Sequence, residues 1–94
     1  MLEKVKLALR IKTKAFDNEI EDLIAAALAD LRLAGVVLPD GGQEEPIIIR
    51  AVITFCKLHF GEPENPDRLK LSYDEQKAQL KTATGFTDWG DANG

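Results

Sequence analysis

Two residues have the side chains best suited to chemistry, and each is the only one of its type in the 94 residues. Cys56 and His59 are three positions apart, so on a helix both could point the same way. A structural zinc site takes four ligands, and a nucleophilic thiolate needs an orienting group as well as a base. Cys56 also lies within an apolar run, which raises the pKa of a thiol. We therefore expect no metal, no cofactor and no catalytic residue.

A second candidate is a run of carboxylates at residues 17–22, which could form a carboxylate pair or a cation site. The other interpretation is structural, because the run begins a predicted helix, where negative charge interacts favourably with the helix dipole. Asp17 stands where a side chain can cap that helix. We favour the structural interpretation and expect a protein that is not an enzyme. The run comprises Asp17, Glu19, Glu21 and Asp22.

The third candidate is a basic set near the start of the chain: Lys4, Lys6, Arg10, Lys12 and Lys14. It could meet DNA or an acidic partner, or it could be the solvated side of an amphipathic helix and a linker. No aromatic residues interleave with it, which favours the solvated side. The formal net charge of −4 also argues against general nucleic-acid binding, because binding to phosphates requires a basic face.

The clearest element that could position these residues is a helix over residues 18–34. Its apolar residues recur at spacings of three and four, and Gly35 provides a stop after it. We expect the core to combine this stripe with the helix over residues 46–60. The expected core residues are Leu23, Ile24, Leu28, Leu31, Ile48, Val52 and Phe55.

The 46–60 segment is apolar on almost every side. Its three consecutive isoleucines would also suit a strand, but Pro46 at its start, Gly61 after its end and its length favour a helix. Arg50, Thr54 and Lys57 form one narrow polar stripe along it. A helix this apolar is normally buried on several sides, and one of those sides could be a subunit interface.

Shorter signals complete an all-α bundle of about four helices, with the other two over residues 2–10 and 66–82. The helix at 66–82 has a thin apolar seam, so most of it faces water or a partner. Residues 1–84 are expected to form one domain and residues 85–94 a flexible tail with two large aromatics. The candidate interface residues are Leu71, Tyr73, Phe86 and Trp89. No signal peptide and no run of about 20 apolar residues is present, so we expect a soluble protein without a membrane partner.

In order and spacing, these features resemble the small head–tail connector proteins of tailed bacteriophages, also called head-completion or DNA-packaging adaptor proteins. The matching parts cover residues 2 to about 82, and the resemblance lies in their order and spacing. They are LEKVKLALRI at 2–11, the acid-led helix from Asp17 through IEDLIAAA at 20–27, IIIRAVI at 47–53, KLHFG at 57–61, and LKLSYD at 69–74 followed by Leu80.

The resemblance implies a protomer that joins a homo-oligomeric ring of about a dozen copies, a heterologous closed assembly. The ring would sit under the portal protein at the head–tail junction of the virion and dock the next connector or tail protein. DNA would pass through the ring without sequence-specific binding, and the protein would be made in the host cytoplasm. Two alternatives stay open: a small helical DNA-binding regulator and an adaptor for a cellular partner.

Overall fold

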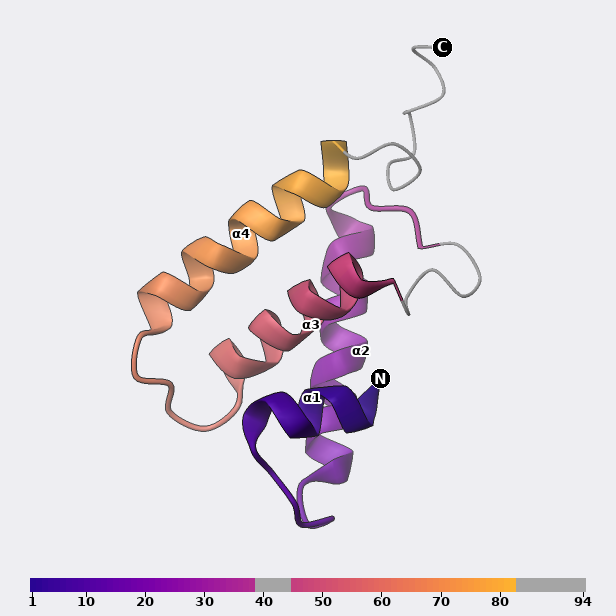
Figure 1. Cartoon of the computed structure of the whole chain (residues 1–94). Coiled ribbons are helices and arrows are strands. Elements are labelled where there is room, and N and C mark those ends of the chain that lie inside the picture. The colour runs from indigo at the N-terminus through magenta and orange to yellow at the C-terminus, as the bar shows by residue number, and fades with distance from the viewer. Residues whose placement is uncertain (39–44, 83–94) are drawn as a thin grey trace.

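The computed structural model describes residues 1–38 and 45–82 of the chain (Figure 1). Over these residues it contains four helices and no sheet: α1 (Leu2–Leu9), α2 (Asp17–Leu33), α3 (Pro46–His59) and α4 (Pro66–Thr82). The all-α prediction is confirmed, and each observed helix begins and ends within one residue of its predicted bounds. The strand alternative for the three isoleucines is wrong, because Ile47, Ile48 and Ile49 form the first turn of α3.

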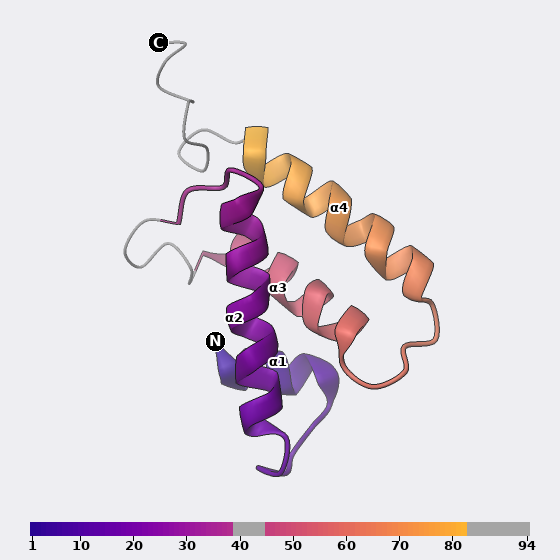
Figure 2. The same ribbon diagram turned by 180° about the vertical axis from the view of Figure 1, so that it is seen from behind.

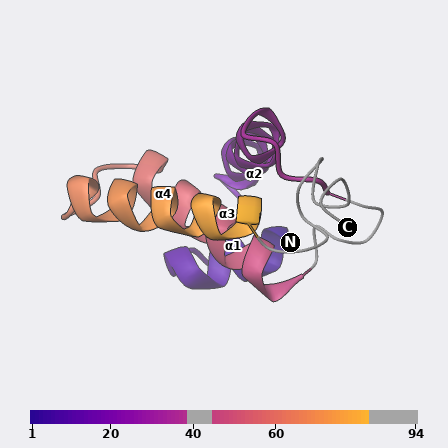
Figure 3. The ribbon, with the colours of Figure 1, turned by 90° about the horizontal axis from the view of Figure 1, so that it is seen from above.

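Helix α3 lies in the middle of the fold and packs against each of the other three helices (Figures 1 and 3). Seen from behind, α2 crosses in front of α3, and α4 runs beside α3, above it in this view (Figure 2). This position explains why α3 is apolar on several sides. Its buried residues are Ile48, Ile49, Ala51, Val52, Thr54 and Cys56. The polar Thr54 is accommodated because its hydroxyl donates to the Arg50 carbonyl, one turn back, at 3.0 Å.

The core is a single cluster to which all four helices contribute. Of the residues expected there, Ile24, Leu31, Ile48 and Val52 are buried, whereas Leu23, Leu28 and Phe55 are partly buried and pack against the cluster. At a typical 1.5–3 kcal/mol for each large aliphatic side chain, burial of this kind is the main stabilising contribution in so small a domain. The other large aliphatic side chains that are fully buried among the described residues are Val5, Ile20 and Leu80.

Helix α2 ends in a tight glycine cap. Gly35 has a φ of +97°, and its amide donates to the Arg32 carbonyl, while the Val36 amide donates to the Leu31 carbonyl. This is the paired hydrogen bonding of a Schellman motif, in which the residue after the glycine also packs back on the helix. Leu31 and Val36 are both buried. Gly35 therefore acts as the predicted stop.

Helix α1 ends in the same way but without a glycine. Arg10 has a φ of +61°, and the amides of Arg10 and Ile11 donate to the carbonyls of Leu7 and Lys6. A left-handed conformation costs a residue with a Cβ roughly 1–2 kcal/mol. The turn nevertheless directs the chain from α1 to the start of α2.

Two expectations at the junction of α1 and α2 are wrong. Asp17 does not cap α2: it is the first helical residue, the N-cap is Phe16, and no side chain makes the capping bond. Its carboxylate instead meets Lys6, with Nζ and Oδ1 2.7 Å apart. The contact is an ion pair rather than an aligned hydrogen bond, since Oδ1 has no hydrogen-bond partner among residues 1–38 and 45–82. Lys6, expected on a solvated face, is buried because this pairing compensates its charge.

Candidate functional site

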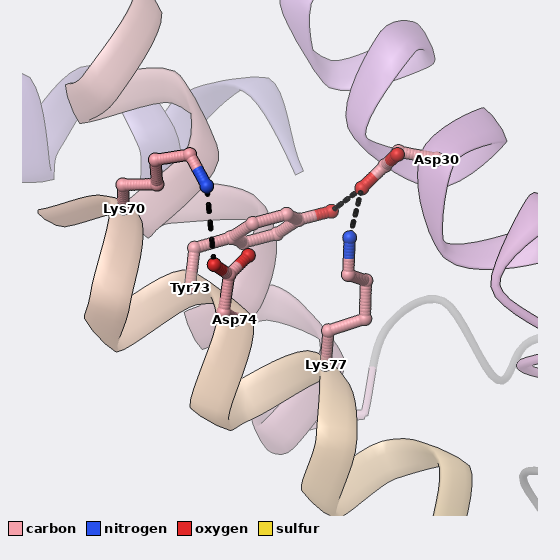
Figure 4. Close-up of polar contacts among 5 residues, drawn as sticks. All are labelled: Asp30, Lys70, Tyr73, Asp74 and Lys77. Atoms are coloured by element: carbon pink, nitrogen blue, oxygen red, sulfur yellow. Dashed lines mark hydrogen bonds and ion pairs between the residues drawn. The ribbon is translucent and has the colours of Figure 1, made fainter.

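A polar contact fixes α4 against α2. The Tyr73 hydroxyl donates to Asp30 Oδ2 at 2.6 Å, and Lys77 Nζ lies 3.1 Å from the same oxygen (Figure 4). The Lys77 ammonium also lies 5.0 Å from the centre of the Tyr73 ring, a favourable position for a cation over an aromatic face. One carboxylate on α2 thus accepts from two successive turns of α4.

The electrostatics of this contact follow from its geometry. The Tyr73 hydroxyl and then the Lys77 ammonium lower the pKa of Asp30, although partial burial opposes them. Burial and the neighbouring Asp30 carboxylate raise the pKa of Tyr73. At neutral pH the tyrosine is therefore a proton donor and the aspartate an acceptor. The arrangement is structural: it holds a helix in place rather than preparing a nucleophile.

Cys56 and His59 do not form a reactive pair. Cys56 is fully buried, and burial raises the pKa of its thiol to about 12, as its apolar surroundings predicted. His59 packs on Phe55, with ring centres 4.3 Å apart, and Phe55 in turn meets the Tyr73 ring edge-on. No group of three or more potential metal ligands occurs among residues 1–38 and 45–82.

A groove follows the seam between α3 and α4. It consists of three adjoining hollows. The hollow beside Pro46 shares Gln76 with the middle hollow, and the middle hollow shares Lys57 and Leu69 with the hollow beside α1. We call this the α3–α4 groove. Besides these residues it is lined by Ile47, Arg50, Ile53, Thr54, Ser72 and Gln79, with Ala8, Leu9, Pro63, Glu64, Asn65 and Arg68 at the α1 end.

The groove is positively charged although the whole chain carries −4. Arg50, Lys57 and Arg68 line it, and Glu64 is the one carboxylate among its described lining residues. None of the three cations makes an ion pair with another described residue, and all three are exposed. Gln76 also lines the groove, and its side-chain oxygen is buried without a hydrogen-bond partner among the described residues.

A surface that combines acidic and apolar side chains lies on α2. Its outward side carries exposed alanines and ends in Leu33, which is 88% exposed. Carboxylates are exposed at its start, where Glu19, Glu21 and Asp22 stand. We call the set Asn18, Glu19, Asp22, Ala25, Ala26, Ala29 and Leu33 the α2 outer face; these residues share one side of the helix, away from the buried Ile20, Ile24, Ala27 and Leu31.

The predicted interface residues have different positions. Leu71 projects from α4 and is 60% exposed. Tyr73 was expected at an interface but is buried within the protomer, because its ring packs on Phe55 and its hydroxyl donates to Asp30. Phe86 and Trp89 lie outside the described residues, as does the predicted tail, residues 85–94.

The basic set near the start of the chain is not one continuous patch. Lys4, Arg10, Lys12 and Lys14 are exposed, but Lys6 is buried and paired with Asp17. The positive surface that the fold does assemble is the groove, from the predicted Arg50–Thr54–Lys57 stripe and from Arg68. Sequence reasoning identified the stripe by its helical spacing but had no signal for Arg68, which joins it only through the packing of α4.

Comparison with known families identifies the chain. A family model described as "Phage connector protein" matches residues 1–86. Because the match spans nearly the whole chain, the protein belongs to the phage connector protein family. Neither the curated proteins nor the solved structures provide a match. The resemblance to head–tail connectors is therefore confirmed at the level of the family.

Family membership sets the general role. Connector proteins are components of the phage particle, and their partners are other head or tail proteins. Among residues 1–38 and 45–82, no helix has the length and apolar character required to cross a bilayer.

Proposed function

We propose that the protein is a structural protomer of the phage head–tail connector. Copies of it join in a ring under the portal protein, extend the DNA channel and dock the next connector or tail component. The observation that carries this proposal is the family match over residues 1–86. In this proposal the protein works by binding other proteins, and it has no catalytic role.

The protomer has properties that suit such a ring. A closed ring needs two unlike surfaces on each subunit, so that every copy presents one to each neighbour. The α3–α4 groove is positive, and the start of α2 is negative. The net negative charge of the chain also suits a channel through which DNA must slide, since like charges limit adhesion.

Further contacts are proposed for α4 and the segment after it. Leu71 is a large apolar side chain on the exposed side of α4 and would contact portal or a tail component. Phe86 and Trp89 would be anchors, since large aromatic residues often supply much of the binding energy of an interface. On this proposal Trp89→Ala leaves the melting temperature of the domain unchanged and weakens binding to the partner.

The experiment is reconstitution with the portal protein of the same phage. Purified chain is mixed with portal rings and examined by negative-stain electron microscopy, with portal alone as the control. The proposal predicts an added ring of density at one end of the portal along its axis. Portal particles indistinguishable from the control, at saturating concentrations of the chain, would contradict it.

The alternative of a DNA-binding regulator makes a different prediction, namely salt-sensitive binding to duplex DNA. The burial of Lys6 against Asp17 removes one cation from the patch on which that alternative depended. A gel-shift titration of the chain with duplex DNA at low salt separates the two functions. The connector proposal predicts no specific shift.

A further inference from the structure

We propose that the α2 outer face of one copy docks into the α3–α4 groove of the next copy. The proposal rests on the proposed ring and names its subunit interface. Its starting point is the groove, whose three cations lack ion-pair partners among the described residues. In a chain of net charge −4, such a concentration of positive charge on one face is complementary to a negatively charged occupant.

The chemistry of the occupant follows from the groove lining. Isoleucine and leucine side chains lie between the cations, so the occupant must offer apolar as well as acidic contacts. The α2 outer face has this combination: carboxylates at its start, alanines in the middle and Leu33 at its end. Alanines also let a helix approach a seam closely, because they project little from the backbone.

The spacing of the two surfaces matches. Along α2, Asp22 and Leu33 are 11 positions apart, or about 16 Å at a rise of 1.5 Å per residue. Along α3, Ile47 and Lys57 are 10 positions apart, or about 15 Å. With the two helices antiparallel, Leu33 of one copy reaches Ile47 of the next while Asp22 reaches Lys57. Ile47 is itself 37% exposed and so accessible to a neighbour.

The positions of Arg68 and Glu19 also fit the antiparallel arrangement. Arg68 shares the α1 end of the groove with Lys57, and Glu19 lies one turn before Asp22 on α2. The acidic start of the α2 outer face therefore meets two cations at once. The two surfaces have no residue in common, so one copy can use both at the same time. Such an interface joins copies head to tail, and the angle between successive copies determines whether the ring closes.

A charge-reversal series tests this interface. The groove variant carries Lys57→Glu and Arg68→Glu; the control variant carries Lys4→Glu and Lys12→Glu, which change the net charge equally at exposed positions outside the groove. Circular dichroism melting checks that each variant is folded. Sedimentation velocity then measures self-association, with portal rings added if the wild-type chain associates only on portal. We expect the groove variant to associate at least roughly tenfold more weakly than the control.

A charge-swap variant identifies the occupant. Adding Glu19→Lys and Asp22→Lys to the groove variant restores the wild-type net charge and reverses both partners. Restored association supports α2 as the occupant, whereas continued loss would overturn that choice. Equal association of the groove and control variants would overturn the groove as the interface. If the wild-type chain does not associate even when portal is present, the result contradicts the ring and therefore the proposed function, whatever the variants do.

Cross-linking provides an independent readout. Leu33→Cys and Ile47→Cys are made in separate chains and mixed with a short bismaleimide; the native Cys56 is fully buried and contributes little background. The proposal predicts a cross-linked dimer from this mixture. The control mixture pairs Leu33→Cys with Leu71→Cys, which changes an exposed leucine on α4 that lies outside the groove lining. Equal yields from the two mixtures would contradict the antiparallel placement.

Discussion

Tyr73 on α4 donates its hydroxyl to Asp30 on α2, a residue 43 positions earlier in the chain, at 2.6 Å. The bond joins the two helices on either side of α3, and Lys77 reinforces it from the next turn of α4. Because α4 forms one wall of the α3–α4 groove, this contact helps determine the shape of the proposed interface.

Removing the hydroxyl should loosen α4. We expect Tyr73→Phe to lower the free energy of unfolding by roughly 1–2 kcal/mol, since a hydrogen bond to a charged group is lost while the ring stays packed. Urea denaturation followed by circular dichroism measures the change. Lys70→Ala is the control, because its ion pair with Asp74 is exposed and should contribute little. Equal effects of the two substitutions would show that the hydroxyl contact is not stabilising.

The same contact predicts a pH dependence. The pKa of Asp30 is lowered in the folded state from its ordinary value of 3.8, chiefly by the Tyr73 hydroxyl. Its stabilising contribution is therefore present above the unfolded pKa and is lost as the pH falls through the folded value. We expect Asp30→Asn to be less stable than wild type at pH 6 and to lose less stability between pH 5 and pH 2. Melting curves across that range measure both; parallel wild-type and variant profiles would contradict the assignment.

The Lys6–Asp17 pair gives a prediction for the junction of α1 and α2. Asp17→Asn leaves a buried ammonium without its counter-ion and should cost about 1–3 kcal/mol. Combining it with Lys6→Met removes the buried charge as well, so the double variant should be more stable than Asp17→Asn alone. Chemical denaturation of the wild type, both single variants and the double variant provides the coupling energy. A coupling energy near zero would mean that the pair does not stabilise the fold.

Arg10 offers a stabilising substitution. Its φ of +61° is strained for a residue with a Cβ but accessible to glycine. Arg10→Gly should therefore raise the free energy of unfolding by up to about 1 kcal/mol. Arg10→Ala controls for loss of the side chain and should not stabilise, because alanine keeps the strain. Thermal melting compares the two variants; a lower melting temperature for the glycine variant than for the alanine variant would be inconsistent with strain at this position.

The helices were predictable because their signals are local. Apolar spacing, Pro46 and the glycines that follow α2 and α3 determine where the helices begin and end, independently of tertiary contacts. The contacts between helices were not predictable in the same way. Lys6 was expected on a solvated face because it is charged, and Tyr73 was expected at an interface. Each is buried because a carboxylate elsewhere in the fold, Asp17 or Asp30, lies within reach.

The same distinction holds for the candidate surfaces. The stripe of Arg50, Thr54 and Lys57 follows from helical spacing alone. Its extension into a groove depends on α4, which brings Arg68 and Gln76 beside it. The charge of the groove therefore could not be inferred from the net charge of the chain, which has the opposite sign.

The proposed function requires copies of this chain to assemble on the portal protein. Its most direct test is the mass of the complex of chain and portal, measured by native mass spectrometry. One discrete species is expected, in which about a dozen copies of the chain, the number implied by the resemblance to head–tail connectors, are added to one portal ring. A spectrum containing only unmodified portal rings and free chain, at concentrations well above those of assembly, would contradict it.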